Sequence, residues 1–172
     1  RLTAARSTRN GQTPRKNIFQ YFQETANLIS DGSTCLIYPG ARWIHRSGKG
    51  MAQFGLQQIN DERLSRVDFY PNSKDIFTTI DIIPDGISIV YKDIKKKTKK
   101  FEYVYHDKGN SDAVVIDSPG EELIPLNPKD MSIVKKVDIF VKSNKLSYLN
   151  GKIFPRSLFG IESNFVQDNI EK

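Results

Sequence analysis

The period of the hydrophobic pattern changes along the chain and predicts alternating helices and strands. Apolar residues recur at helical spacing over 17–30 and again over 47–60. The patterns over 34–39 and 63–70 predict strands, and the nearly unbroken apolar run over 34–39 is typical of a strand buried on both faces. We therefore expect a strand–helix–strand unit with parallel strands and a right-handed crossover.

The rest of the chain predicts shorter and less regular elements. Strands are expected over 87–92 and 101–106, and we expect them to pair as a hairpin. A helix and several loops follow. The chain then divides into a flexible basic segment over 1–13, an α/β domain over 14–106, and a connector, helix and small C-terminal extension over 107–172.

Composition allows one packed domain and gives limited guidance on compartment. A length of 172 residues is enough to bury a core. The hydrophobic fraction of 38% is low for a self-contained globule, and the aromatic fraction of 10% argues against disorder. The only cysteine, Cys35, falls in the strand over 34–39, where we expect a buried and inert thiol. A single cysteine fits a reducing cytoplasm, and no apolar run approaches the length of a bilayer span.

Basic residues are concentrated in two places, and the net charge is +6. One is the opening segment, and the other begins at the end of the strand over 87–92 and precedes the strand over 101–106. Such clusters favour polyphosphate partners through counterion release, although a lysine-rich turn is more often only solvated. The second cluster comprises Lys92, Lys95, Lys96, Lys97, Lys99 and Lys100.

Motifs for phosphate or metal chemistry are incomplete. Gly48-Lys49-Gly50 lacks both the earlier glycine and the Ser or Thr that a P-loop requires, so Lys49 remains only a candidate contact to a DNA phosphate. His45 and His106 lie far apart, and neither has an acidic residue at metal-ligand spacing. We therefore expect no metal site.

Three further residues are candidates for DNA contact. Arg42 and Trp43 follow the first strand, where side chains face the crevice in which open α/β sheets bind ligands. Arg42 could hold a phosphate there, whereas Trp43 could equally line a pocket or pack in the core. Phe77 follows a polar loop, and it could stack on an extruded base or fold back on the sheet.

The order of these elements, with Pro39, Ala41-Arg42-Trp43 and a loop ending in Phe77, resembles adenine-specific DNA methyltransferases of the TaqI-like gamma class. The similar region is the C-terminal half of the methyltransferase domain of type II restriction-modification enzymes. The resemblance implies the second half of a Rossmann-like sheet, with parallel strands beside an antiparallel one. It also implies that Phe77 stacks on a flipped adenine and that Arg42 and Trp43 lie beside the cleft.

The resemblance further implies transfer of a methyl group from S-adenosylmethionine to the exocyclic amine of that adenine. The family's glycine loop for S-adenosylmethionine and its catalytic Asn-Pro-Pro-Tyr do not occur in this sequence. The cofactor and catalytic residues would then belong to the parent protein, and this chain alone would be inactive. Its implied partners are double-stranded DNA and the remainder of the domain, and an exposed sheet edge could also pair with a second copy.

Two other classes of function remain open. A non-catalytic DNA-binding or specificity module of a restriction-modification system would need only a continuous basic face. A metal-dependent nuclease would need clustered carboxylates, and the region of Asp68 to Asp81 lacks the usual spacing for them.

Overall fold

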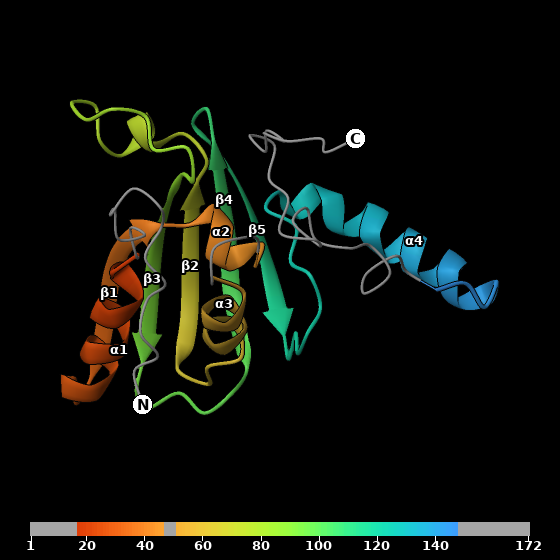
Figure 1. Cartoon of the computed structure of the whole chain (residues 1–172), viewed down its shortest axis with the longest axis horizontal. Helices are drawn as coiled ribbons and strands as arrows, with labels where there is room; N and C mark the ends of the chain where they lie inside the picture. Colours follow the sequence, from red (N-terminus) through yellow and green to blue (C-terminus); the bar gives the residue numbers. More distant parts are fainter. Residues whose placement is uncertain (1–16, 47–50, 148–172) are drawn as a thin grey trace, which may run out of the picture. The chain divides into compact units, whose positions relative to one another are not determined.

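A computed structural model describes residues 17–46 and 51–147. These residues form a five-stranded mixed sheet with helices, and they fall into two compact units divided after Met131 (Figure 1). The helices are α1 (Phe19–Ile29), α2 (Ala41–Ile44), α3 (Met51–Ile59) and α4 (Met131–Ser143), with short 3-10 turns η1 (Ser73–Asp75) and η2 (Pro128–Asp130). The strands are β1 (Ser33–Pro39), β2 (Leu64–Tyr70), β3 (Ile87–Asp93), β4 (Lys100–Asp107) and β5 (Asn110–Asp117).

The strand order is β1-β3-β2-β4-β5. β3 lies between β1 and β2 and is antiparallel to both, so β1 and β2 point in the same direction. β2 then pairs with β4 in parallel, and β4 pairs with β5 antiparallel. The expected α/β class is therefore confirmed, with two parallel strands and an antiparallel strand beside them.

The expected hairpin between the third and fourth strands is wrong. β3 uses both of its edges to bond β1 and β2, which leaves no edge for β4. The hairpin forms one strand later, where Lys108 and Gly109 both adopt positive φ angles in the two-residue link between β4 and β5. That backbone suits the twist of an antiparallel pair. The sheet consequently extends to Asp117, beyond the domain boundary expected at residue 106.

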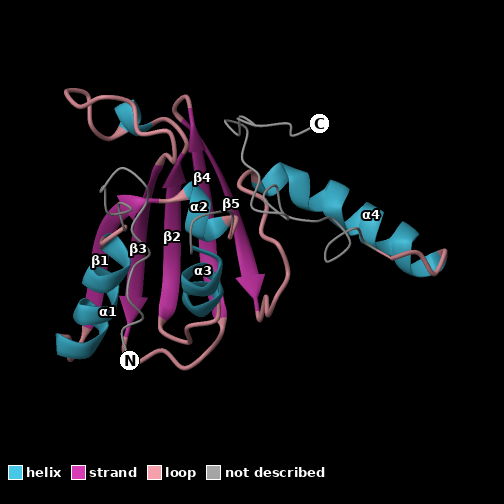
Figure 2. Cartoon of the chain, viewed as in Figure 1, coloured by secondary structure: helices cyan, strands magenta, loops and turns pink. Residues whose placement is uncertain are grey.

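The expectation that the first strand is buried on both faces is also wrong. β1 is an edge strand, and its side chains alternate between the covered and open faces of the sheet. Cys35 and Ile37 are exposed, whereas Tyr38 is buried. The physical reason is that α1, α2 and α3 cover only one face of the sheet (Figure 2).

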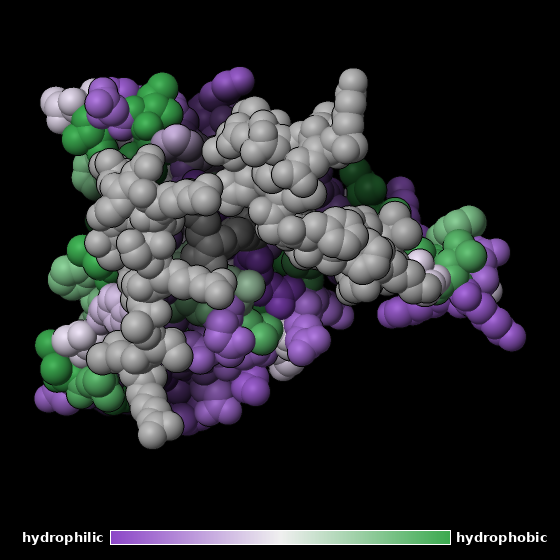
Figure 3. Space-filling view, in the orientation of Figure 1, coloured by the Kyte–Doolittle hydropathy of each residue, from purple (hydrophilic) through white to green (hydrophobic). Residues whose placement is uncertain are grey.

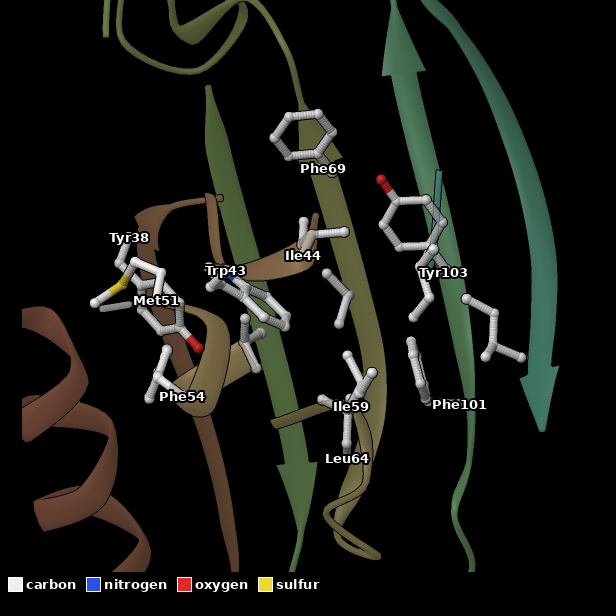
Figure 4. Packing of buried hydrophobic residues seen from close by; sticks show 14 residues of the cluster. Tyr38, Trp43, Ile44, Met51, Phe54, Ile59, Leu64, Phe69, Phe101 and Tyr103 are labelled. Atoms are coloured by element: carbon white, nitrogen blue, oxygen red, sulfur yellow. The ribbon is translucent and has the colours of Figure 1, made fainter. Parts of the chain in front are cut away.

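The core lies between that helical layer and the covered face of the sheet (Figure 4). Tyr38 is the centre of an aromatic cluster that joins β1 to the helices: its ring stacks on Phe19 at 5.1 Å and approaches Trp43 and Phe54 at 6.1 and 6.4 Å. β2 and β4 supply the other end of the core. The largest buried residues there are Leu64, Val67, Phe69, Phe101 and Tyr103.

Three buried polar side chains of this core, Gln23, Trp43 and Ser88, take part in hydrogen bonds that join the helices to the sheet. The Tyr38 hydroxyl donates to Gln23 Oε1 at 3.1 Å, and Gln23 is fully buried on α1. Trp43 Nε1 donates to Ser88 Oγ at 3.1 Å, and that hydroxyl donates in turn to the Tyr38 carbonyl at 2.9 Å. Because an unpaired buried polar group costs free energy, these bonds fix the helices on the sheet in one arrangement.

α3 packs against α2 through a glycine. A Cβ atom added to Gly55 would lie 2.0 Å from the Trp43 carbonyl oxygen, which is backbone and has little freedom to move. The absence of a side chain at this position therefore sets the spacing of the two helices and, with it, the position of Trp43.

α4 forms most of the described part of the second unit, and it is amphipathic. Several of its apolar side chains are exposed, and no residue of the helix is buried. The most exposed are Ile133, Ile139 and Phe140.

We predict that Gly55→Ala lowers the free energy of unfolding by about 3 kcal/mol, because overpacking of a close contact has costs of this order. Gly32→Ala is the matched control, since an added Cβ there meets nothing within 4 Å. Denaturant unfolding of both variants measures the difference. Equal stabilities would contradict the close approach of α2 and α3.

Candidate functional site

The C-terminal ends of β1, β2 and β4 lie at one edge of the sheet, which follows from their shared direction. α2 follows β1 at this edge, and the loop over 71–86 leaves β2 and returns to β3 there (Figure 1). Open α/β sheets bind ligands outside the carboxyl ends of their parallel strands. This edge is therefore the candidate site, and Arg42 and Phe77 both belong to it.

The 71–86 loop is held by internal hydrogen bonds. Ser73 is fully buried, and its hydroxyl accepts from the Ile83 backbone N–H at 2.9 Å, which closes the loop across ten residues. Asn72 caps η1 by accepting from the Lys74 N–H at 3.1 Å. The Lys74 ammonium then donates to the backbone carbonyls of Thr78 and Ile80. These contacts stabilise the backbone on both sides of Phe77.

Phe77 is half-buried at the end of η1, and its backbone N–H donates to the Ser73 carbonyl at 2.8 Å. The sequence left open whether this ring is exposed or folded onto the sheet, and the structure places it between the two extremes. Phe77 is thus a partly exposed residue on a loop with defined geometry. Ile80 and Ile82 of the same loop are 40% and 66% exposed, so two apolar side chains lie among the polar residues on the outside of the loop.

Arg42 lies on α2 and forms an ion pair with the other end of the loop. Its Nε is 2.9 Å from Asp85 Oδ1, and the Arg42 side chain is 37% exposed. The backbone N–H of Ala41 also donates to the Asp85 carbonyl at 2.8 Å. Arg42 thus fixes α2 to the turn before β3, and part of its guanidinium remains accessible to an anion.

Trp43 and Lys49 are the other two residues predicted to contact DNA, and the structure describes only Trp43. Trp43 is 1% exposed and packs in the core, so its indole is not accessible to DNA in this structure. Of the two positions considered for this residue, pocket wall and core, the structure places it in the core. Lys49 lies outside the described residues, as does the basic segment over 1–13.

A polar network on the open face of the sheet was not predicted. Arg66 forms two hydrogen bonds with Asp68, at 2.6 and 2.8 Å, and one with Glu102 at 2.7 Å. His106 Nε2 lies 2.7 Å from Asp68 Oδ1, and its ring stacks on Tyr70 with centroids 4.1 Å apart. The network joins β2 to β4 and ends at the candidate site.

The sequence contains no local signal for this network. Asp68 and His106 are 38 residues apart and meet only because β2 and β4 pair in parallel. Burial raises the pKa of Asp68, but the hydrogen bonds from Arg66 and His106 outweigh it and hold the pKa below its ordinary value. Asp68 is therefore a carboxylate at neutral pH, and His106 is oriented by it.

The described residues contain neither a candidate metal site nor a candidate membrane-spanning helix. Within 17–46 and 51–147, no three His, Cys, Asp or Glu side chains come together in a way that could hold a metal ion. In the same residues, no helix combines the length and apolarity that a bilayer span requires.

Comparison of the chain with protein-family models and with curated protein sequences yields no match.

We predict that Asp68→Asn destabilises the protein by about 1–2 kcal/mol at pH 7, a modest figure because Arg66 is 43% exposed and its charge is screened. The pKa of Asp68 is lower in the folded protein, so its contribution is complete above its unfolded pKa of about 3.9 and is lost as the pH falls through the folded value. Unfolding free energies between neutral pH and pH ~2 measure the difference between variant and native protein.

The control is Asp81→Asn, because Asp81 is exposed in the 71–86 loop. It should leave stability nearly unchanged at every pH. A difference for Asp68→Asn that does not shrink in acid would contradict the role of the ionised carboxylate.

Proposed function

We propose that this chain is the second half of an adenine-specific DNA methyltransferase domain from a type II restriction-modification enzyme. In this proposal the Rossmann-like sheet is completed by an upstream half, which supplies the S-adenosylmethionine site and the catalytic residues. The complete domain transfers the methyl group to the exocyclic amine of a flipped adenine. The chain alone holds no cofactor and is inactive, and its compartment is the cytoplasm.

The observation that carries the proposal is the placement of Phe77. It is half-buried on an internally bonded loop, and that loop lies at the carboxyl ends of the parallel strands β1 and β2. An enzyme that modifies a base must extrude it from the duplex and stack it on an apolar or aromatic side chain. A partly accessible ring on a stabilised loop has the properties that this step requires.

The remaining site residues have distinct parts in the proposal. Arg42 binds a DNA phosphate with the N–H groups that Asp85 leaves accessible. Lys49, which lies outside the described residues, supplies a second positive charge in this proposal. Trp43 acts indirectly, because its bond to Ser88 positions α2 and hence Arg42.

The free edge of the sheet supports an upstream partner. β1 is bonded to β3 on one side and has no strand on the other among the described residues. The flanking helix α1 carries exposed apolar side chains, and hydrophobic residues gather over it at the left of the space-filling view (Figure 3). They include Tyr21, Phe22, Leu28 and Ile29. The remainder of the domain would cover this edge, and without it the edge is open to a second copy of the chain.

A non-catalytic DNA-binding module is the second candidate, because the turn between β3 and β4 carries several exposed lysines. That function needs no stacking residue, so the effect of changing Phe77 distinguishes the two proposals.

We predict that Phe77→Ala, made in a polypeptide that also contains the upstream half, lowers adenine methylation by about 5- to 150-fold. Loss of one base–aromatic stack costs roughly 1–3 kcal/mol, which gives this range. Duplex affinity, measured by fluorescence anisotropy, should change much less. Phe77→Trp should retain most of the activity, because it preserves an aromatic face.

Ile82→Ala is the matched control, since Ile82 is an exposed apolar residue of the same loop. It should leave turnover nearly unchanged. Full methylation by Phe77→Ala would eliminate the stacking role, and equal losses in both variants would point to a general effect on the loop.

A further inference from the structure

The connection between β3 and β4 presents a group of lysines whose ammonium groups have no ion-pair partner among the described residues. All four side chains are exposed, and they fall within a six-residue stretch. We refer to this group as the lysine turn. It comprises Lys95, Lys97, Lys99 and Lys100.

Two other lysines of the same sequence cluster point inward and anchor this turn. Lys92 is 2% exposed, and its ammonium lies 2.8 Å from Asp61 Oδ2. Lys96 donates to the backbone carbonyls of Glu62 and Leu64, at 3.1 and 2.7 Å, and also to that of Thr98. The sequence cluster therefore separates into two groups. Lys92 and Lys96 bond to residues 61–64 and fix the connection to the start of β2, whereas the other four lysines are exposed to solvent.

Two acidic residues close to the lysine turn, Asp61 and Asp93, form no ion pair with its four lysines. Asp61 is already bonded to Lys92 and to Arg63, at 2.8 Å in each case. Asp93 accepts from the backbone N–H of Lys95 rather than from its ammonium, at 2.9 Å. The turn thus keeps an excess of positive charge.

The lysine turn lies at the opposite end of the sheet from the Phe77 loop. β3 begins at the candidate site and ends at the turn, and its seven residues span about 20 Å at 3.3 Å per residue. The views show the 71–86 loop above the strands and the β3–β4 connection below them, where hydrophilic residues gather (Figures 1 and 3). The turn is therefore a separate surface and not part of the candidate site.

We propose that the lysine turn binds the phosphate backbone of duplex DNA, at a surface distinct from the base pocket. Residues 94–99 contain no aromatic side chain, so the turn has charge but no platform on which a base could stack. That combination suits sequence-independent contact with phosphates. The choice of duplex DNA as the partner rests on the proposed function.

The test is the salt dependence of duplex binding, measured with the full chain, a duplex of several helical turns and no cofactor. Each phosphate contact contributes about 0.9 to the slope of log affinity against log salt concentration. Changing Lys95, Lys97 and Lys99 together to Gln should lower the slope by about 2–3. The corresponding triple change to Arg should leave it near the native value, because the charges are retained.

The matched control changes three exposed lysines of α4 to Gln, namely Lys135, Lys136 and Lys142, and removes the same charge. A smaller change of slope for this control supports the proposal, and an equal change overturns it by showing a general effect of net charge. Turn-dependent binding of single-stranded RNA or of anionic lipid vesicles, with no effect on duplex DNA, also overturns it.

This experiment separates the two proposals. If the slope falls for the turn variant but Phe77→Ala methylates normally, the lysine turn binds DNA and the methyltransferase role of Phe77 fails. If methylation depends on Phe77 and the slope is unchanged, only the lysine turn proposal fails.

Discussion

The position of β3 between β1 and β2 is the constraint on which the rest of the structure depends. β3 is hydrogen-bonded along both edges, over seven residues to β1 and over most of its length to β2. Because β3 is antiparallel to β2, the chain must return to β3 at the carboxyl edge, which creates the 71–86 loop and holds Phe77 there. For the same reason, the link to β4 must lie at the opposite end, where the lysine turn is found.

The helices α1, α2 and α3 cover only one face of the sheet, so the two faces are stabilised in different ways (Figure 2). The helices pack on the aromatic cluster around Tyr38, and the buried bonds of Gln23 and Ser88 fix them there. The helices α1, α2 and α3 leave the other face of the sheet open, and polar side chains on that face bond to one another (Figure 2). The bonds among Arg66, Asp68 and His106 are the clearest case, and they join the parallel strands β2 and β4.

Local pattern predicted the elements well because each depends on residues close together in the sequence. The helical spacing over 17–30 and the strand at 63–70 both correspond to observed elements, whereas the loop expected to end at Phe77 continues to residue 86. Pairing between distant strands leaves no such local trace. For that reason the predicted hairpin between the third and fourth strands was wrong, and the contact between Asp68 and His106 could not be predicted from the sequence. Burial was misjudged for Cys35 because an apolar run does not reveal whether its strand lies at an edge of the sheet.

The proposed function treats the chain as one half of a catalytic domain, and S-adenosylmethionine binding tests that claim most directly. Calorimetry would compare this chain with a longer polypeptide that includes the upstream half. The account predicts that only the longer polypeptide binds, because the cofactor site lies in the half that completes the sheet at β1. Absence of binding by both would contradict the methyltransferase assignment and would favour a non-catalytic DNA-binding module.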